Sequence, residues 1–322
     1  MLNQLLFVCG FPGGGTDLTK NILNAHPNIY LNGEMPFLQN IAKYGYGPNT
    51  RFSTIKEIKS FQNHLRDLNT WGNIENINND FDSELNIKKE LHLEEVLKTC
   101  FSNKSLPVWG NKTPQNTEHI TQLANLFPSA HFIIVVRDVR DICLSWNNKW
   151  GKDMYLCAHK WAMRMKTGWL ACQRISPDRY LFLHYEKILT NTEEVCRTMC
   201  DFIGIPFSER MLEHHKYANS LIDGKINYGR EILPENREKW RIQLSQKKIH
   251  RIEEIAYESM NTFSYQITFA SSPRPIIISE KILGYVRDFL ALFLVGNRAR
   301  QKNNIRTRAS VFIFELRKRY RL

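Results

Sequence analysis

A glycine-rich loop at residues 10–15 carries the strongest chemical signal in the sequence; it lies between an apolar run at 5–9 and helical spacing at 16–25. Glycines let backbone N–H groups point into a turn and meet an oxyanion, and the following helix adds its positive N-terminal end. The loop is therefore predicted to hold a phosphate. The spacing from Gly10 to Gly15 copies a nucleoside-triphosphate loop, but Thr16 and Asp17 stand where its lysine would follow, which disfavours an ATPase or a kinase. The alternative is a tight strand-to-helix turn without a ligand.

A second anion site is predicted at Arg137, which directly follows the apolar run 131–136, with Ser145 two helical turns later. Ligands of parallel sheets bind at the carboxyl ends of the strands, where arginine offers a fork of donors and serine a hydroxyl. Taken alone, the alternating charges of residues 137–141 favour a salt-bridged start of a helix, with Ser145 in solvent.

Alternating strands and helices must position these residues. Continuous apolar runs predict buried strands at 5–9, 131–136 and 180–184, and helical spacing predicts helices at 16–25, 91–101, 120–127, 139–150, 161–175, 193–203 and 247–260. The alternation predicts an α/β fold in which a parallel sheet is flanked by helices on both faces. We expect one domain over residues 1–268 with a variable, substrate-facing insertion at 44–105, followed by a basic, partly apolar helical tail at 269–322.

Composition limits the classes of protein that the chain can belong to. Its 322 residues, 43% of them hydrophobic, suffice for a sizeable core, which excludes disorder for most of the chain. Lys and Arg outnumber Asp and Glu by 44 to 32, which predicts an anionic partner. The seven cysteines form no CxxC pair, so we expect buried free thiols of a reducing compartment, with neither disulfides nor a metal site.

The basic excess is concentrated in the tail, because residues 271–322 hold 12 basic and 3 acidic residues. There, basic residues alternate with the apolar run 311–316, after the apolar segment 276–295. This pattern fits a peripheral contact with an acidic membrane surface and equally a solvated helix packed on the body. A cytoplasmic location is expected, since we find no signal-peptide pattern and no uncharged run of bilayer length. Nucleic acid is the least favoured partner.

Taken together, these segments resemble the sulfotransferases that use 3'-phosphoadenosine 5'-phosphosulfate (PAPS), particularly their bacterial and tyrosylprotein-sulfotransferase-like branch. The match follows the family's order over most of residues 5–265, in the segments 7–23, 25–28, 32–34, 109–114, 132–145, 180–188 and 239–240. It includes Asn-Gly-Glu at 32–34 and Trp-Gly-Asn-Lys-Thr-Pro at 109–114. The resemblance implies a P-loop-related α/β fold and sulfuryl transfer from PAPS to a hydroxyl or amine of a small molecule, glycan or peptide. The chemistry requires no metal.

The resemblance also implies roles for single residues. Glu34 takes the position of the family's catalytic base, and Lys112 that of the catalytic lysine in the Asn-Lys-x-Pro motif; the alternatives are a surface glutamate and a rim lysine. Arg137 and Ser145 match the pair, eight residues apart, that binds the 3'-phosphate. The residues expected to bind PAPS are Pro12, Gly13, Gly14, Gly15, Thr16, Asp17, Leu18, Arg137, Ser145, Tyr185 and Arg230.

Several further assignments leave alternatives open. Tyr185 belongs either to the nucleotide pocket or to the core. Arg230 is one of several basic residues in a late loop, 225–239, that is expected to close over PAPS. Arg140 is expected either to support the 3'-phosphate or to pair with Asp141.

Two positions depart from the family's pattern. Gly13 stands where the family has Arg or Lys, and Asp17 replaces its second threonine. An aspartate near a phosphosulfate is unfavourable unless it faces away toward the helix N-terminus. Lys20 or Lys112 is expected to supply the missing positive charge. Two other functions are therefore kept: a P-loop nucleotide-triphosphate kinase-like enzyme, and a catalytically weak nucleotide-binding protein of the same fold.

Overall fold

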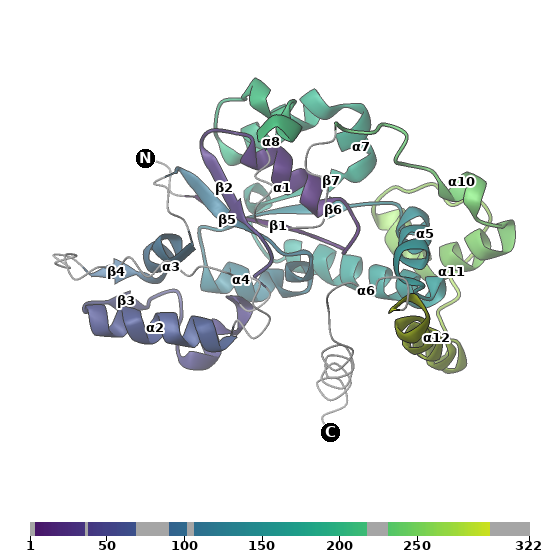
Figure 1. Ribbon diagram of the computed structural model, residues 1–322, viewed down its shortest axis with the longest axis horizontal. Helices are drawn as coiled ribbons and strands as arrows, with labels where there is room; N and C mark the ends of the chain where they lie inside the picture. The colour runs from purple at the N-terminus through teal and green to yellow at the C-terminus, as the bar shows by residue number, and fades with distance from the viewer. Residues whose placement is uncertain (1–3, 36–37, 69–89, 102–105, 218–230, 297–322) are drawn as a thin grey trace.

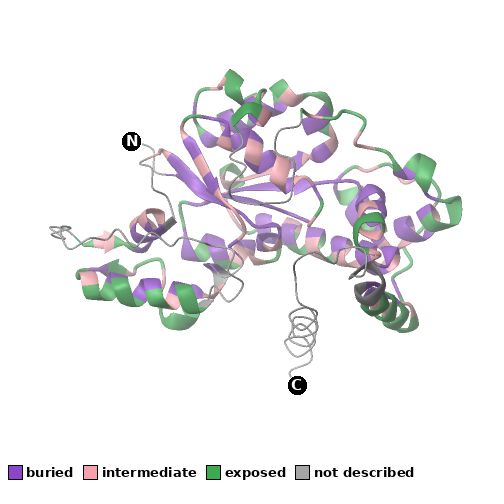
Figure 2. Cartoon of the chain, in the orientation of Figure 1, coloured by how far each residue is buried: buried purple, intermediate pink, exposed green. Residues whose placement is uncertain are grey.

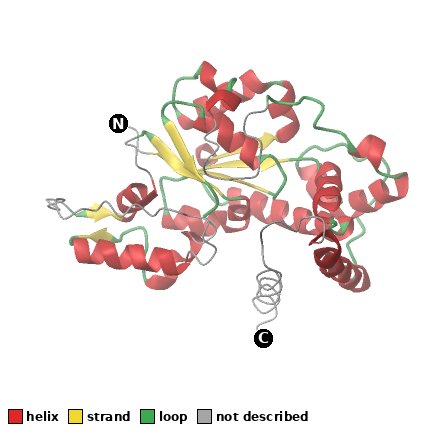
Figure 3. Ribbon diagram, in the orientation of Figure 1, coloured by secondary structure: helices red, strands yellow, loops and turns green. Residues whose placement is uncertain are grey.

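A five-stranded parallel sheet forms the centre of the molecule (Figures 1 and 3). The computed structural model describes residues 4–35, 38–68, 90–101, 106–217 and 231–296. The strand order is β2-β5-β1-β6-β7, and every neighbouring pair is parallel. The strands are β1 (Gln4–Gly10), β2 (Ile29–Asn32), β5 (Val108–Lys112), β6 (His131–Val136) and β7 (Tyr180–His184). A separate antiparallel pair joins β3 (Arg51–Phe52) to β4 (Leu91–His92).

Helices surround this sheet in the described residues. The α-helices are α1 (Thr16–Asn24), α2 (Ile55–Leu68), α3 (Leu93–Phe101), α4 (Ile120–Leu126), α5 (Val139–Trp150), α6 (Met154–Cys172), α7 (Tyr185–Thr190), α8 (Thr192–Ile203), α9 (His214–Tyr217), α10 (Trp240–Gln243), α11 (Gln246–Thr262) and α12 (Ile278–Gly296). Short 3-10 helices are η1 (Leu38–Tyr44), η2 (Pro114–His119), η3 (Pro177–Arg179) and η4 (Glu209–Met211). The predicted parallel α/β fold with helices on both faces is confirmed.

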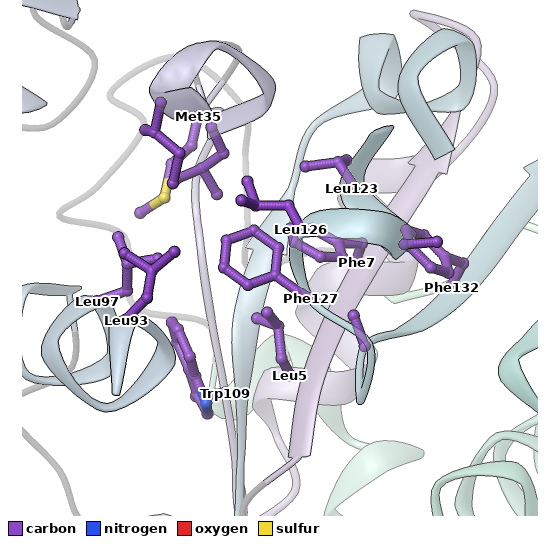
Figure 4. Packing of buried hydrophobic residues seen from close by; sticks show 14 of the residues in the cluster. Leu5, Phe7, Met35, Leu93, Leu97, Trp109, Leu123, Leu126, Phe127 and Phe132 are labelled. Carbon is purple, nitrogen blue, oxygen red and sulfur yellow. The ribbon is translucent and has the colours of Figure 1, made fainter. Parts of the chain in front are cut away.

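Alternate residues of β1 enter two different cores, as the two-residue period of a strand requires. Leu6 and Val8 pack with α1 and α8 on one face. Leu5 and Phe7 pack on the other face, where Phe127, just after α4, lies among the clustered side chains of Figure 4. Burial on both faces explains why the central strands read as continuous apolar runs. Figure 2 shows the sheet as mostly buried.

A third core lies beside the sheet, where α5, α6, α10 and α11 meet around Trp161 and Trp240. Within it, α6 begins at Met154 rather than at the predicted residue 161. The reason is a cap: the Asp153 carboxylate accepts hydrogen bonds from the N–H groups of Tyr155 and Leu156, at 3.0 and 2.9 Å. All seven cysteines are buried and free, as predicted.

The segment predicted as a substrate-facing insertion contains α2, a helix that the sequence analysis did not predict. Ile58, Phe61 and Leu65 of α2 recur every three to four residues. They join the core on the face of the sheet that carries Leu5 and Phe7. The boundary at residue 268 and the substrate-facing role of 44–105 stay predictions. Of the C-terminal tail, residues 278–296 form α12, which packs against α6; residues 297–322 lie outside the described residues.

Candidate active site

The carboxyl edge of the sheet gathers the predicted site residues. The last residue of β2 pairs with β5, so Glu34, two residues further on, emerges beside Lys112 at the end of β5. The glycine loop leaves β1 on the other side of β5. Arg137 directly follows β6, and Tyr185 directly follows β7. All five parallel strands therefore deliver a candidate residue or loop to one edge, where ligands of such sheets bind.

The glycine loop turns sharply between β1 and α1. Gly13 and Gly15 have φ angles of 83° and 99°, a region that residues with a Cβ rarely enter. A Cβ on Gly15 would also overlap the ring of Tyr185, and one on Gly14 would lie 2.8 Å from the carbonyl oxygen of Phe11. Side chains are therefore excluded from the loop at the point where the first N–H groups of α1 have no partner within the helix. This arrangement suits an anion.

Lys112 is a buried cation between two carboxylates. Its side chain is 4% exposed, and its Nζ lies 2.9 Å from Oε1 of Glu34 and 2.6 Å from Oδ1 of Asp17. The side chains of Glu34 and Asp17 are 35% and 38% exposed, so both also reach solvent. Asp17 therefore does not face away from the site: it contacts the lysine that the resemblance implies is catalytic.

The two carboxylates outweigh the burial of Lys112. Burial alone lowers the pKa of an ammonium group, whereas neighbouring negative charge raises it. Desolvation is the largest single influence here, but attraction to and hydrogen bonds with Asp17 and Glu34 together raise the pKa of Lys112 above its ordinary value of 10.5. At neutral pH Lys112 is charged, and its charge is balanced before any anion binds.

Hydrogen bonds between two loops hold Glu34 in place. The backbone N–H of Met35 donates to Oγ1 of Thr113 at 2.8 Å, and that hydroxyl donates to Oδ1 of Asn111 at 2.9 Å. Thr113 and Asn111 are buried. The segment after β2 is thereby fastened to the end of β5, which keeps the Glu34 carboxylate beside Lys112.

Arg137 is the cation on the other half of the edge. Its Nη1 and Nη2 donate to the carbonyl oxygens of Gly13 and Asn236, at 3.1 and 3.2 Å. Its guanidinium lies 4.3 Å from the ring centre of Tyr185, a cation–π contact. The Nε of Arg137 is buried and has no hydrogen-bond partner within the part of the chain that the structure describes. An acceptor from a ligand would satisfy that donor.

A pocket of about 390 Å³ opens beside Arg137 and Ser145, a volume typical of small-molecule sites. Its lining residues are Arg137, Asp141, Leu144, Ser145, Asn148, Lys149, Asn236, Lys239 and Gln243. Asp141 is already engaged, because its carboxylate accepts from the N–H groups of Glu238 and Trp240 at 2.7 and 3.0 Å. The lining carries more positive than negative charge and suits a phosphate.

The match to known families agrees with this geometry. The model described as the sulfotransferase family matches residues 6–209. The chain belongs to the sulfotransferase family. It is 27% identical over 221 residues to protein-tyrosine sulfotransferase 1 of Danio rerio, and the aligned region covers 66% of this chain and 56% of that protein. It is 25% identical over 227 residues to the protein-tyrosine sulfotransferase of Drosophila melanogaster, with coverages of 67% and 41%. The chain thus spans about half the length of these relatives.

A solved structure shows the same fold. The sulfotransferase domain from the Synechococcus PCC 7002 olefin synthase has a TM-score of 0.57 and 17% identity, over 83% of this chain and 96% of that domain. The sulfotransferase fold predicted from the sequence is confirmed, and the kinase-like alternative is not favoured.

Most of the residues predicted to bind PAPS lie at the loop or the pocket. The carbonyl oxygen of Pro12 accepts a hydrogen bond from Nε1 of Trp146 at 2.8 Å, which ties the loop to α5. Thr16 is buried at the start of α1, whereas the side chain of Leu18 packs against the core shared by α1 and α8. Arg230 lies outside the described residues.

Arg140 belongs to the interior of the protein, and of the two alternatives for it, the pairing with Asp141 is wrong. Its side chain is 3% exposed and lies 2.7 Å from Oδ2 of Asp138 and 2.6 Å from Oε1 of Glu253. The guanidinium also covers the ring of Trp240 at 3.6 Å. Two carboxylates already hold Arg140, one of them from α11, so it has a structural role.

The sequence analysis did not single out Asn236 and Lys239 as site residues. Lys239 lies in the matched segment 239–240, so its position was a usable signal. Asn236 contributes its backbone carbonyl to Arg137, while its side-chain Nδ2 donates to the hydroxyl of Tyr185 at 2.9 Å. A backbone contact leaves no trace in residue type. Lys112, one of the two lysines considered as replacements for the missing cation, contacts both Glu34 and Asp17.

Proposed function

We propose that this chain transfers the sulfuryl group of PAPS to a hydroxyl or amine of an acceptor. The observation that carries the proposal is the contact between buried Lys112 and Glu34, at the same edge of the sheet as the glycine loop. Membership of the sulfotransferase family supports the class of reaction. The protein-tyrosine sulfotransferase relatives support a tyrosine-containing peptide as the first acceptor to test, before glycans and small phenols.

The two halves of the edge would bind different parts of PAPS. The glycine loop and the first turn of α1 would hold the 5'-phosphosulfate through backbone N–H groups. Arg137 and Ser145 would hold the 3'-phosphate. Two features support this assignment: the loop excludes side chains, and the buried Nε of Arg137 lacks an acceptor among the described residues.

Glu34 and Lys112 would carry the transfer itself. The acceptor oxygen or nitrogen forms a bond to sulfur while the bond from sulfur to the 5'-phosphate oxygen breaks. Glu34 takes the proton that the acceptor loses. Lys112 offsets the negative charge that grows on the leaving phosphate oxygen. The products are the sulfated acceptor and adenosine 3',5'-bisphosphate (PAP).

Radiolabelled PAPS tests the proposal directly. The full chain is incubated with labelled PAPS and a panel of tyrosine peptides, glycans and phenols, and PAP and ATP binding are measured by calorimetry. We expect label in at least one acceptor with the native chain, none with Glu34→Ala, and normal transfer with Glu193→Ala, which removes an exposed glutamate of α8. PAP binding without transfer to any acceptor would favour the catalytically weak alternative; binding of ATP but not of PAP would contradict PAPS as the donor.

A further inference from the structure

Helix α12 attaches to the body by its polar side. Asp288 is 5% exposed and accepts a hydrogen bond from the backbone N–H of Asp153 at 2.8 Å. Arg287 Nη1 lies 3.0 Å from Oδ2 of the same Asp153. Gly284 permits close packing, because a Cβ there would lie 3.0 Å from the Cβ of Leu156 on α6. Charged groups thus determine which side of α12 faces the body.

The opposite side of α12 is apolar and faces solvent; the helix is largely green in Figure 2. Ile278, Ile282, Leu283, Val286 and Leu290, here termed the outer stripe, are 76%, 59%, 48%, 47% and 51% exposed. At roughly 100° per residue, these five side chains lie within an arc of about 140°. Soluble proteins rarely leave so continuous an apolar surface uncovered unless it meets a partner.

The ion pairs and the hydrogen bond that hold α12 on the body would be broken if the helix rotated to bury the outer stripe. Oδ2 of Asp288 lies 3.7 and 3.6 Å from the ammonium groups of Lys152 and Lys160. Rotation would separate these groups and also break the hydrogen bond from Asp153. A helix whose polar side is fixed and whose apolar side points outward has the form of an interfacial helix. Among the described helices, none combines the length and the hydropathy needed to cross a bilayer.

Charge indicates what covers the outer stripe. Residues 297–322, which directly follow α12, include nine Lys or Arg and a single acidic residue, Glu315. A second copy of the chain would carry an equally basic segment directly after the same helix, and repulsion between the two segments opposes pairing. An anionic lipid surface attracts it instead. We propose that α12 docks this protein on an anionic membrane surface, with the outer stripe at the boundary of headgroups and acyl chains. This proposal is independent of the chemistry at the active site.

Vesicle sedimentation of the full chain tests the docking. Vesicles of phosphatidylcholine with about 30% phosphatidylserine are compared with pure phosphatidylcholine. The test variant is Ile282→Gln/Val286→Gln, and the matched control is Ile242→Gln/Leu170→Gln, which removes two exposed apolar side chains of α10 and α6. We expect about tenfold or stronger partition onto the acidic vesicles, a loss of about tenfold in the test variant, and less than a twofold change in the control.

Each other outcome contradicts the proposal. Equal binding to both vesicle types would contradict the preference for an anionic surface, and no binding to either would contradict membrane docking. Binding that weakens with salt but is unchanged in the test variant assigns the contact to the basic residues and not to α12. A concentration-dependent dimer in sedimentation, lost in the test variant without vesicle binding, assigns the outer stripe to a second copy. Unchanged thermal unfolding and PAP binding in both variants verify that they are folded.

Discussion

Lys112 and Arg137 are cations at the same edge of the sheet, but their surroundings differ. Lys112 contacts two carboxylates, whereas Arg137 donates to two carbonyl oxygens and keeps a buried Nε without a partner among the described residues. The charge of Lys112 is therefore offset by contacting carboxylates before a ligand arrives, whereas no carboxylate of the described residues forms an ion pair with Arg137. An unbalanced cation binds an existing anion, while a balanced one contributes most when new charge develops. The difference separates binding from catalysis.

Replacing Lys112 should produce the largest effect. Lys112→Ala removes the group that offsets charge on the leaving oxygen, so we expect turnover to fall by about 10³-fold or more. PAP affinity should fall far less, by about three- to tenfold, because the variant loses one positive charge beside two carboxylates. Single-turnover transfer from labelled PAPS and calorimetry with PAP measure the two quantities. A loss of PAP affinity as large as the loss of turnover would show that Lys112 binds the ground state.

Arg137→Ala should give the opposite pattern. Hydrogen bonds to charged groups contribute about 1.5–3 kcal/mol, so PAP affinity should fall by roughly 10- to 150-fold. Turnover at saturating PAPS should change less than affinity. Arg197→Ala, which removes an exposed arginine of α8, serves as the control for charge. If Arg137→Ala bound PAP normally, the pocket beside Ser145 would not be the site of the 3'-phosphate.

The sequence predicted the central strands better than the strand that carries Lys112. β1, β6 and β7 are continuous apolar runs, but β5 contains Gly110, Asn111 and Lys112, and every one of its residues is buried. A Cβ on Gly110 would overlap the carbonyl oxygen of Leu6, so glycine is required there. The buried Oδ1 of Asn111 accepts a hydrogen bond from Oγ1 of Thr113. Such burial depends on hydrogen bonds and close approach between segments, which no local pattern shows.

The same limit applies to the charged residues. The resemblance implied roles for Glu34 and Lys112, and the structure brings them together, but it gave no reason for Asp17 to contact the lysine. Residue spacing suggested Asp141 as an ion-pair partner of Arg140, whereas in the structure Arg140 forms an ion pair with Glu253 of α11. Charge partners are chosen by tertiary packing, so the sequence predicts which cations are present but not which ones remain available to a ligand.

Asp17→Asn should make Lys112 resemble Arg137 more closely, because it leaves Lys112 with fewer carboxylate partners. It removes one of the two carboxylates that balance the lysine, at the start of the helix that would meet the phosphosulfate. PAP affinity should rise by about three- to tenfold, corresponding to roughly 1 kcal/mol for a partly exposed charge. Calorimetry in low salt measures it. Asp201→Asn, an exposed position on α8, should leave PAP affinity unchanged; weaker PAP binding by Asp17→Asn would indicate that Asp17 shapes the loop instead.

The smallest expected effect is a shift of the alkaline limb of activity. Burial lowers the pKa of Lys112, but Asp17 and Glu34 together raise it above 10.5. The native chain should therefore keep the Lys112 ammonium group, and the stability that the ion pairs contribute, at pH values below 10.5. Both should be lost only as the pH rises through the raised pKa. Asp17→Asn removes one of the two carboxylates that raise the pKa of Lys112, so Lys112 of this variant should lose its proton at lower pH. The ratio of turnover in Asp17→Asn to that of the native chain, measured from pH 7.5 to 10.5, cancels ionisation of the acceptor. The ratio should fall by about two- to threefold toward the alkaline end. A constant ratio would mean that Asp17 does not control the protonation of Lys112, and the contrast with Arg137 would then rest on Glu34 alone.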